Sequence, residues 1–519
     1  MSKKKKIMIG GGILTIIAVI FFISTASAKD KYPKVDLSKA NKGDFVTEEG
    51  FSKNKLYKAY PKKIKTTFST IVVPENRTKE DSRLISLPVK RLRSFSDNPK
   101  EPVFLLYGGP GSSNLRRAPV VWLLENHDVV MVGYRGIDGS VILETPEIPT
   151  AMVEIEDAYS LDGIKQLANV SGKVFDRLES SGIDVHAYNM IEVLDDVDDA
   201  RKALGYEKIN LYSQSYGTRL AYLYGLRYAE NLNRSVKIAV NPPGKFIWKA
   251  EDTEAILKKV ADQWNSDPLC AEKSPDIHAT MAKVNKTLPY TWRKIEIDLP
   301  SIKAMMFIMA YGRNGFAQIF NAYVAADNGD YSGLAFLKMA YAQLPFSDGM
   351  SFGENFSKAM CADRDTSAVE GKILAQEAAL IGAPFSTLFD LVNFDGWPID
   401  LIPEEYRTLQ HSEAEALLLS GNIDVSTPHQ YATELLEYMP NGHQVIFDNR
   451  GHQDIGLLQN DAYHDLVNTF YQEGTVDGSA FTFQPINFNE SKPSFQKMGK
   501  MFRFLKRLGL TKFVAKLMN

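Results

Sequence analysis

Short runs of apolar residues recur along much of the chain, and polar or amphipathic stretches separate them. Runs of this kind are typical of strands that are buried on both faces of a parallel sheet. The predicted strands are 102–107, 129–132, the run that starts at Leu211, 236–240, 416–420 and 444–447. The stretches between them include helical patterns such as 195–205. This alternation predicts an α/β fold in which helices flank a mostly parallel sheet.

Between about residues 245 and 406 the alternation of strands and helices stops. This segment carries helical patterns at 252–265, 301–309 and 369–381. It is also rich in aromatic residues, which include Trp264, Trp292, Phe307, Phe316 and Phe320. The segment predicts a large helical cap, inserted before the strand 416–420. Most of its aromatic side chains are expected in the cap's own core, and the rest can line an apolar substrate pocket.

The two ends of the chain have a different character from the rest. Lys3 to Lys6 are basic, 7–23 is apolar and 24–28 is made of small residues, which is the pattern of a secretory signal. We therefore predict export to the periplasm, the cell envelope or the medium. An uncleaved anchor is the alternative, because the apolar run approaches the length of a membrane-spanning helix.

The tail 491–519 has eight basic residues and no acidic one. Its apolar residues recur every three to four positions, at Met498, Met501, Phe502, Leu505, Leu508 and Phe513. This spacing predicts an amphipathic helix. Such a helix either lies on an anionic membrane surface or packs on the body of the protein.

Composition limits the organisation of the chain and its partners. With 519 residues and 44% hydrophobic content, it is large enough for one core and an accessory domain. The predicted divisions are a signal at 1–28, a core at 29–244 and 407–490, the cap at 245–406 and the tail helix at 491–519. A formal charge of −3 argues against nucleic acid as a partner.

A serine stands where a predicted strand runs into a helix, in the sequence L-Y-S-Q-S-Y-G at 211–217. A sharp strand-to-helix turn exposes a serine hydroxyl at the end of a sheet, where it can attack a carbonyl group. Ser215 is therefore the predicted nucleophile. The strand 102–107 leads into G-G-P-G at 108–111, a loop whose backbone N–H groups can approach a substrate oxygen closely.

A serine nucleophile on such a sheet requires an acid and then a histidine, both later in the chain. The histidines that lie late enough are His429, His443, His452 and His464. Functional groups in open α/β sheets lie beyond the carboxyl ends of the strands. His452 follows the strand 444–447, whereas His443 precedes it, so His452 is the predicted base. By the same rule Asp424, after the strand 416–420, is the predicted acid, and Asp448 is the alternative.

The order of these motifs resembles the proline iminopeptidase and tripeptidyl aminopeptidase branch of the α/β-hydrolases. The similarity runs from about residue 67 to 471 and includes G-G-P-G, R-G-x-x-x-S from Arg135, S-Y-G from Ser215 and G-x-x-D-x-x-T-P at 421–428. The resemblance implies an exported serine exopeptidase that acts on the free amino end of short peptides. Its fold would be the α/β-hydrolase fold with a helical cap before the acid-bearing strand.

The chain departs from the family pattern at four positions. Tyr107 stands where a histidine often precedes the glycines, and Ser213 replaces the first glycine of the serine turn. Gly133 and Asp138 replace the usual Asp and Gly around Arg135. These changes put fine substrate preference in question more than the chemistry.

Further residues follow from the mechanism of such enzymes. The oxyanion is expected at the backbone N–H groups of Tyr216 and of the loop that contains Gly109. An aminopeptidase also needs a carboxylate for the substrate's ammonium group, and Glu354 and Asp363 of the cap are the candidates, with surface solvation as the alternative. No H-E-x-x-H, clustered Cys/His set or phosphate-binding loop occurs in the sequence, so neither a metal nor a cofactor is predicted.

The chain has only two cysteines, Cys270 and Cys361, and both fall in the predicted cap. They resemble cysteines in the lid of the tripeptidyl aminopeptidase-like proteins. An even number of cysteines in an exported chain favours a disulfide, and two buried thiols are the alternative.

Two other functions remain open from the sequence. A carboxylesterase or lipase would use the same three catalytic residues, because fold does not determine substrate. A silent binding protein on the hydrolase scaffold is the third reading, motivated by the departures at Tyr107, Gly133 and Ser213.

Overall fold

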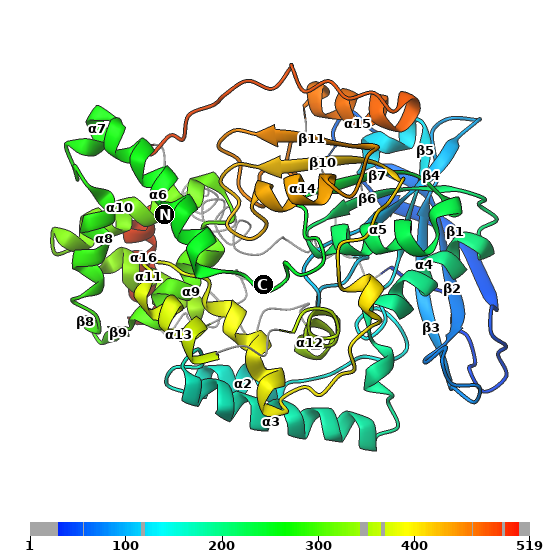
Figure 1. The fold of residues 1–519 in the computed structure, drawn as a ribbon, viewed down its shortest axis with the longest axis horizontal. Coiled ribbons are helices and arrows are strands. Elements are labelled where there is room, and N and C mark those ends of the chain that lie inside the picture. Colours follow the sequence, from blue (N-terminus) through cyan, green and yellow to red (C-terminus); the bar gives the residue numbers. More distant parts are fainter. Residues whose placement is uncertain are drawn as a thin grey trace.

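The computed structural model describes residues 30–55, 57–115, 120–342, 351–364, 369–458, 460–489 and 494–507. The predicted signal 1–28 and the end of the tail lie outside these ranges. A twisted sheet with its helices occupies one side of the molecule, and a mostly helical part occupies the other (Figure 1). Within the described residues, no helix has both the length and the apolar character needed to cross a membrane.

The main sheet has nine strands in the order β1-β2-β3-β5-β4-β6-β7-β10-β11. The first three strands pair antiparallel, as do β3 and β5, and every later pair is parallel. The predicted α/β fold with a mostly parallel sheet is confirmed. The strands are β1 (Phe45–Lys53), β2 (Lys63–Pro74), β3 (Leu84–Leu92), β4 (Lys100–Leu106), β5 (His127–Val132), β6 (Ile209–Gln214), β7 (Leu232–Ile238), β10 (Glu415–Gly421) and β11 (Gly442–Phe447).

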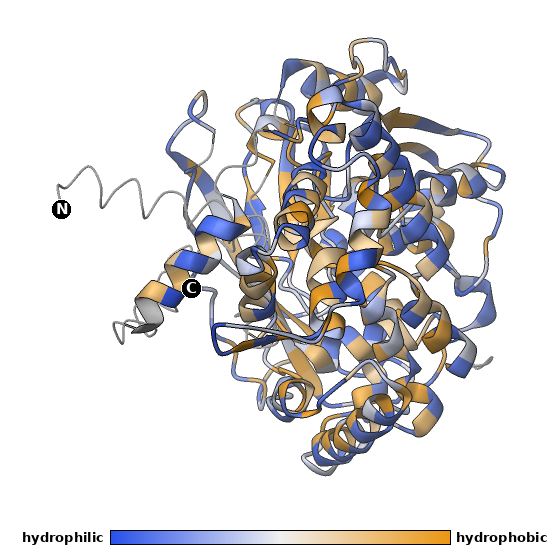
Figure 2. Cartoon of the chain, turned by 90° about the vertical axis from the view of Figure 1, so that its left-hand side faces the viewer, coloured by the Kyte–Doolittle hydropathy of each residue, from blue (hydrophilic) through white to orange (hydrophobic). Residues whose placement is uncertain are grey.

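Both faces of the sheet are covered, which explains why its central strands are apolar throughout. One face packs against α4 (Met190–Ala203), α5 (Tyr216–Arg227) and α14 (His429–Leu436). The other packs against η1 (Val121–Glu125) and α15 (Asp461–Glu473). Alternate residues of a strand point to opposite faces, so neighbouring Leu417 and Leu418 enter different cores. The helices carry both hydrophobic and hydrophilic residues, as expected for amphipathic helices on a core (Figure 2).

The strand predicted at 236–240 ends earlier than expected. β7 stops at Ile238, and Ala239 has a φ of 55°, outside the range of a strand. A positive φ is unusual for a residue with a side chain and marks a sharp change of chain direction. The chain leaves the sheet here and enters the helical part.

The helical part lies between β7 and β10 in the sequence, and both backbone and side-chain contacts join it to the part that contains the sheet. The short hairpin of β8 (Tyr290–Trp292) and β9 (Ile295–Ile297) is its only β-structure within the described ranges. The helices are α6 (Ala250–Ser266), α7 (Pro268–Ala271), α8 (Ile277–Asn285), α9 (Leu299–Met309), α10 (Arg313–Asp327), α11 (Ser332–Tyr341), α12 (Phe352–Met360), α13 (Val369–Ala378), η5 (Pro384–Phe394) and η6 (Glu404–Tyr406).

After α15 the chain crosses from the sheet to the cap and forms α16 (Phe495–Arg507), which lies beside α11 (Figure 1). Phe495 and Met498 are buried there, and a Cβ on Gly499 would lie 2.0 Å from the carbonyl oxygen of Ser332. Lys500 forms a 2.6 Å ion pair with Asp330. The first part of the apolar stripe therefore packs on the cap, whereas the packing alternative placed this helix on the body of the protein.

Candidate active site

Ser215 lies at the turn between β6 and α5, in a backbone conformation that few residues adopt. Its φ is 55° and its ψ is −127°. Strained conformations of this kind are a feature of strand-to-helix nucleophile turns. A Cβ on Gly217 would lie only 1.9 Å from the carbonyl oxygen of Leu106, so only glycine fits where α5 crosses β4. At Ser213 the family's glycine is replaced without strain, because its hydroxyl donates to the carbonyl of Val236 at 2.9 Å.

His452 and Asp424 come together beside Ser215. The Nε2 atom of His452 is 2.9 Å from the Ser215 hydroxyl, and its Nδ1 atom is 2.9 Å from a carboxylate oxygen of Asp424. His452 is 4% exposed and Asp424 is completely buried. The three side chains thus form one line of hydrogen bonds that ends at the serine oxygen. Such a line can remove the serine proton as the oxygen attacks.

Asp424 is held in place by the turn that follows β10. One carboxylate oxygen accepts the backbone N–H groups of Ser426 and Thr427, each at 2.8 Å, and the other accepts the Thr427 hydroxyl at 2.7 Å. These bonds leave the carboxylate oriented toward the imidazole. Asp448, the alternative acid, is exposed and bonds to the side chain of Asn422. The geometry therefore favours Asp424.

The glycine loop, residues 108–111, runs directly over Ser215. A Cβ on Gly108 would lie 2.3 Å from the Cβ of Ser215, so a side chain at 108 would displace the nucleophile. Gly109 has a φ of 74°, which favours glycine. Tyr216 is the first residue of α5, and the first N–H groups of a helix have no partner within it. The two predicted donors, Gly109 and Tyr216, thus belong to the two segments that meet at Ser215.

Two residues support this loop in a way that the sequence analysis did not predict. Asn114 donates to the carbonyls of Leu105 and Val132, at 3.0 and 2.8 Å, and so ties the loop to β4 and β5. Asp138 accepts the backbone N–H groups of Asn114 and Tyr134, at 3.0 and 2.9 Å. A Cβ on Gly133 would lie 2.7 Å from the Cβ of Asp138. The aspartate and the glycine of the family pattern are thus exchanged between positions 133 and 138. The exchange is visible in the sequence only when both positions are considered together.

Aromatic rings from the cap lie against the base. Tyr311, between α9 and α10, has its ring centroid 4.9 Å from that of His452. Phe307 lies 5.5 Å from Tyr311 and 5.3 Å from Trp248. The series of contacts continues through Phe389 and Phe246 to Tyr216, beside the nucleophile. The cap thus presents an apolar, aromatic surface around this end of the sheet.

Glu354 and Asp363, the predicted ammonium-binding residues, have internal partners instead. Glu354 is completely buried and forms an ion pair with Lys358. Asp363 accepts from Arg219 at 2.7 Å and from the backbone N–H of Phe246 at 2.6 Å. A carboxylate that already faces a buried cation has little charge to offer a second one. Both carboxylates therefore bind groups of the protein itself rather than face a substrate.

The predicted disulfide is wrong for this structure, because both cysteines are free and buried. Cys270 belongs to α7, where its N–H donates to the carboxylate of Asp267. Cys361 ends α12, and its thiol contacts the carbonyl oxygen of Lys358 at 3.5 Å. The two residues lie among different neighbours, and burial raises the pKa of each thiol to about 11. The alternative of two buried thiols describes them.

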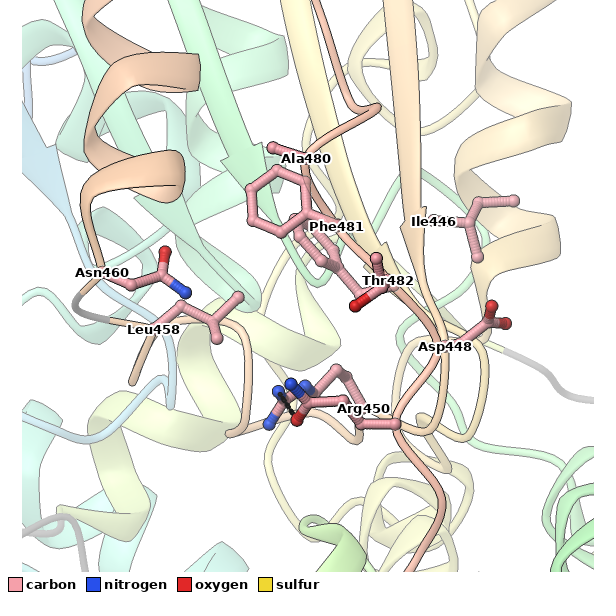
Figure 3. A pocket seen from close by; sticks show the side chains of 10 residues that line it. Ile446, Asp448, Arg450, Leu458, Asn460, Ala480, Phe481 and Thr482 are labelled. Atoms are coloured by element: carbon pink, nitrogen blue, oxygen red, sulfur yellow. Dashed lines mark hydrogen bonds between the residues drawn. The ribbon is translucent and has the colours of Figure 1, made fainter.

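A second site, a pocket, lies beside the end of β11 (Figure 3). Residues at the end of β11 and in the segment after α15 line it, including Asp448, Arg450, Phe481 and Gln484. Arg450 donates to the side-chain oxygen of Gln484 at 3.1 Å. Ser215, His452 and Asp424 are not among the lining residues. The pocket is therefore not the space in which Ser215 would meet an acyl group.

Comparison with known proteins agrees with this geometry. A family profile described as TAP-like protein matches residues 387–481, which include Asp424 and His452. The tripeptidyl aminopeptidases of Streptomyces lividans and Streptomyces coelicolor are each 22% identical to this chain over 475 residues. Each alignment covers 82% of this chain and 84% of the relative.

Solved structures give more distant matches. A meta-cleavage product hydrolase from Pseudomonas fluorescens IP01 aligns over 75% of this chain and 96% of its own, with 15% identity and a TM-score of 0.37. An esterase from Exiguobacterium antarcticum aligns over 76% and 97%, with 11% identity and a TM-score of 0.32. The sheet order is that of an α/β fold, and the sequence matches make the chain similar to α/β-hydrolases of the tripeptidyl aminopeptidase-like branch.

Proposed function

We propose that this hydrolase is a serine aminopeptidase that releases residues from the free amino end of short peptides. The observation that carries the proposal is the line of hydrogen bonds from Asp424 through His452 to Ser215, with both bonds at 2.9 Å. The names of the two Streptomyces relatives support a peptide as the substrate.

In the proposed reaction His452 accepts the Ser215 proton through Nε2 as the serine oxygen attacks the scissile carbonyl. Asp424 holds the imidazole in the required tautomer and stabilises its positive charge. The N–H groups of Gly109 and Tyr216 bind the oxyanion, and preorganised donors of this kind typically contribute a factor of about 10²–10³ each. His452 then protonates the leaving amine. In the second half of the reaction His452 takes a proton from water as the water oxygen attacks the acyl-enzyme, and it returns that proton to Ser215 as the acyl group leaves.

The cap is proposed to exclude water and to bind the apolar part of the acyl group. Tyr311, Phe307 and Trp248 form the aromatic surface nearest the base. An apolar wall strengthens the electrostatic interactions at the reacting atoms because it keeps water away from them. We therefore expect faster turnover of peptides with apolar residues at the cleaved end than of those with charged residues.

The test compares three substrate types with the same mature protein. The first two are a tripeptidyl p-nitroanilide and its amino-acetylated form, and the third is a set of p-nitrophenyl esters of increasing chain length. An aminopeptidase cleaves the free peptide and loses the acetylated one, because it binds the charged amino group. Equal rates on the free and acetylated peptides would reject the exopeptidase. Turnover of the esters alone would instead establish the esterase reading.

Export is part of the same proposal and is supported by the basic, apolar and small-residue segments at 1–28. Expression of the full chain, cell fractionation and amino-terminal sequencing of the mature protein test it. The expected new amino terminus is Lys29. A protein that retains Met1 in the cytoplasmic fraction would contradict export. Co-sedimentation with anionic vesicles, with and without 491–519, tests the membrane contact proposed for the tail.

A further inference from the structure

The first turn of α12 is bonded directly to the glycine loop that runs over Ser215. The backbone N–H of Ser351 donates to the carbonyl of Gly111 at 2.7 Å, and the side-chain amide of Asn355 donates to the carbonyl of Pro110 at 2.7 Å. The N–H of Gly111 in turn donates to the carboxylate of Glu354. Three hydrogen bonds thus join one helical turn of the cap to two consecutive residues of the loop.

The approach of the two segments is too close for any other residue at position 111. Gly111 has a φ of 92°, and a Cβ there would lie 2.5 Å from the carbonyl oxygen of Ser351. Backbone therefore packs on backbone at this point. A small displacement of α12 would move Gly111, and with it Gly108 and Gly109 of the same tight loop.

Glu354 is a charged residue that is costly to bury, and its partners are groups of the protein. It and Lys358 are both completely buried and form an ion pair one turn apart on α12. Lys358 also donates to the carbonyl of Arg135 at 3.0 Å. Burial raises the pKa of Glu354 and lowers that of Lys358, while their mutual contact offsets part of both shifts. Buried pairs of this kind seldom add stability over apolar residues, so their usual advantage is to specify one arrangement.

The other end of α12 reaches the helix that follows the nucleophile. Asp363, two residues beyond Cys361, bonds to both terminal nitrogens of Arg219 on α5, at 2.7 and 3.1 Å. Arg219 is completely buried and also donates to the carbonyl of Pro242. α12 therefore connects the glycine loop to α5, the two segments that carry the proposed oxyanion donors. In Figure 1 it lies between the cap helices and the sheet.

We propose that α12 positions the oxyanion hole, with Glu354 and Asn355 as its positioning residues on the glycine loop. Neither side chain needs to touch the substrate. Their bonds to Gly111 and Pro110 hold the loop at the distance from Tyr216 that a tetrahedral oxyanion requires. The inference rests on the proposed acyl-transfer reaction at Ser215. It gives Glu354 and Asn355 a role in stabilising the transition state through the glycine loop, rather than in binding the substrate's amino group.

The test uses Glu354→Gln and Asn355→Ala in the mature protein. Glutamine retains an acceptor oxygen for Gly111 but leaves Lys358 without a negative partner, and Asn355→Ala removes a single bond at a partly exposed position. Misplacing one oxyanion donor weakens transition-state binding alone, and loss of a donor costs about 10²–10³ in kcat. We expect kcat to fall about tenfold or more in each variant, with KM changed less than about threefold.

Three readouts separate this role from simple destabilisation and from failure of the proposed function. kcat is measured on a tripeptidyl p-nitroanilide and on p-nitrophenyl acetate, together with the rate at which a fluorophosphonate labels Ser215. All three rates should fall together in both variants, because each reaction places negative charge on an oxygen at the same site. Hydrolysis of the ester but not of the peptide would reject the aminopeptidase, while the ester rates would still decide the role of α12.

The matched control is Ser357→Ala on the same helix. Ser357 is buried and accepts from the indole of Trp397 at 3.0 Å, and within the described residues it does not bond to the glycine loop. This variant should lower the Tm while kcat stays within about twofold. The proposal is overturned if Asn355→Ala and Glu354→Gln keep full kcat, or if Ser357→Ala loses as much kcat as they do at an equal Tm. A parent protein that no fluorophosphonate labels would overturn both the function and this role.

Discussion

The sheet edge and the cap each contain a completely buried carboxylate beside a basic side chain, and the two pairs do different things. At the sheet edge Asp424 faces His452, whose second ring nitrogen is 2.9 Å from Ser215. In the cap Glu354 faces Lys358, whose ammonium group ends on the carbonyl of Arg135. Burial and pairing alone therefore do not identify a reactive site. A reactive site is identified by the atom at which the line of hydrogen bonds ends.

A third buried base extends this comparison, because it has no carboxylate at all. Lys237 on β7 is completely buried, and its ammonium group donates to the hydroxyl of Ser235 at 2.8 Å. Burial lowers the pKa of Lys237 to about 7. The three bases thus differ in their partners: His452 faces a carboxylate and a serine, Lys358 a carboxylate and a backbone carbonyl, and Lys237 a hydroxyl.

The largest expected effect is at the end of the sheet-edge line. Ser215→Ala should lower kcat by about 10⁴–10⁶, because the acyl-enzyme cannot form without the hydroxyl. Hydrolysis of a tripeptidyl p-nitroanilide measures it, and thermal unfolding checks that the variant folds. Ser213→Ala is the control, since that hydroxyl bonds only to the backbone of Val236 and its loss should leave kcat within about tenfold. Comparable losses in the two variants would refute the assignment.

The next test distinguishes the two candidate acids. Asp424→Asn should lower kcat by about 10³–10⁴, because an amide favours the wrong tautomer of His452. Asp448→Asn should change kcat less than about threefold, because Asp448 is exposed and contacts the side chain of Asn422. Both variants are compared at saturating substrate. A larger loss at Asp448 would mean that the line of hydrogen bonds ends elsewhere.

The unpaired lysine gives a pH-dependent effect on stability. The pKa of Lys237 is about 7 in the folded chain and near 10.5 when unfolded, so the unfolded chain binds an extra proton between these values. The free energy of unfolding contributed by this residue therefore falls as pH decreases from about 10.5 to 7, and then levels off. Lys237→Met removes this loss. The Tm of this variant should therefore exceed that of the parent by an amount that grows as pH decreases across this window. An advantage that does not change between pH 7 and 10 would contradict the shift.

The smallest effect concerns the C-terminal attachment of the cap. In Gly499→Ala the new methyl group would lie 2.0 Å from the carbonyl oxygen of Ser332, so α16 must shift away from α11. We expect a loss of about 1–3 kcal/mol in stability and a change in kcat of less than about threefold. Lys497→Ala, on the exposed side of the same helix, should leave the Tm unchanged. Equal unfolding temperatures for parent and Gly499→Ala would show that α16 does not depend on this contact.

Much of the fold could be predicted because its signals are local. Apolar runs gave β4, β5, β6, β10 and β11 within a few residues, since a strand buried on both faces must be apolar along its length. The end of β7 was missed, because a positive φ at Ala239 leaves no trace in hydrophobicity. The antiparallel strands β1 to β3 were not predicted either.

By itself, the sequence determined the order of the elements and the placement of Ser215, Asp424 and His452, because each follows a strand at the edge where parallel strands end. Only the tertiary structure decided the roles of Glu354 and Asp363, whose partners Lys358 and Arg219 depend on how α12 meets the sheet. It also decided that Cys270 and Cys361 are buried free thiols rather than a disulfide. Pairing between distant side chains depends on packing that no local pattern encodes.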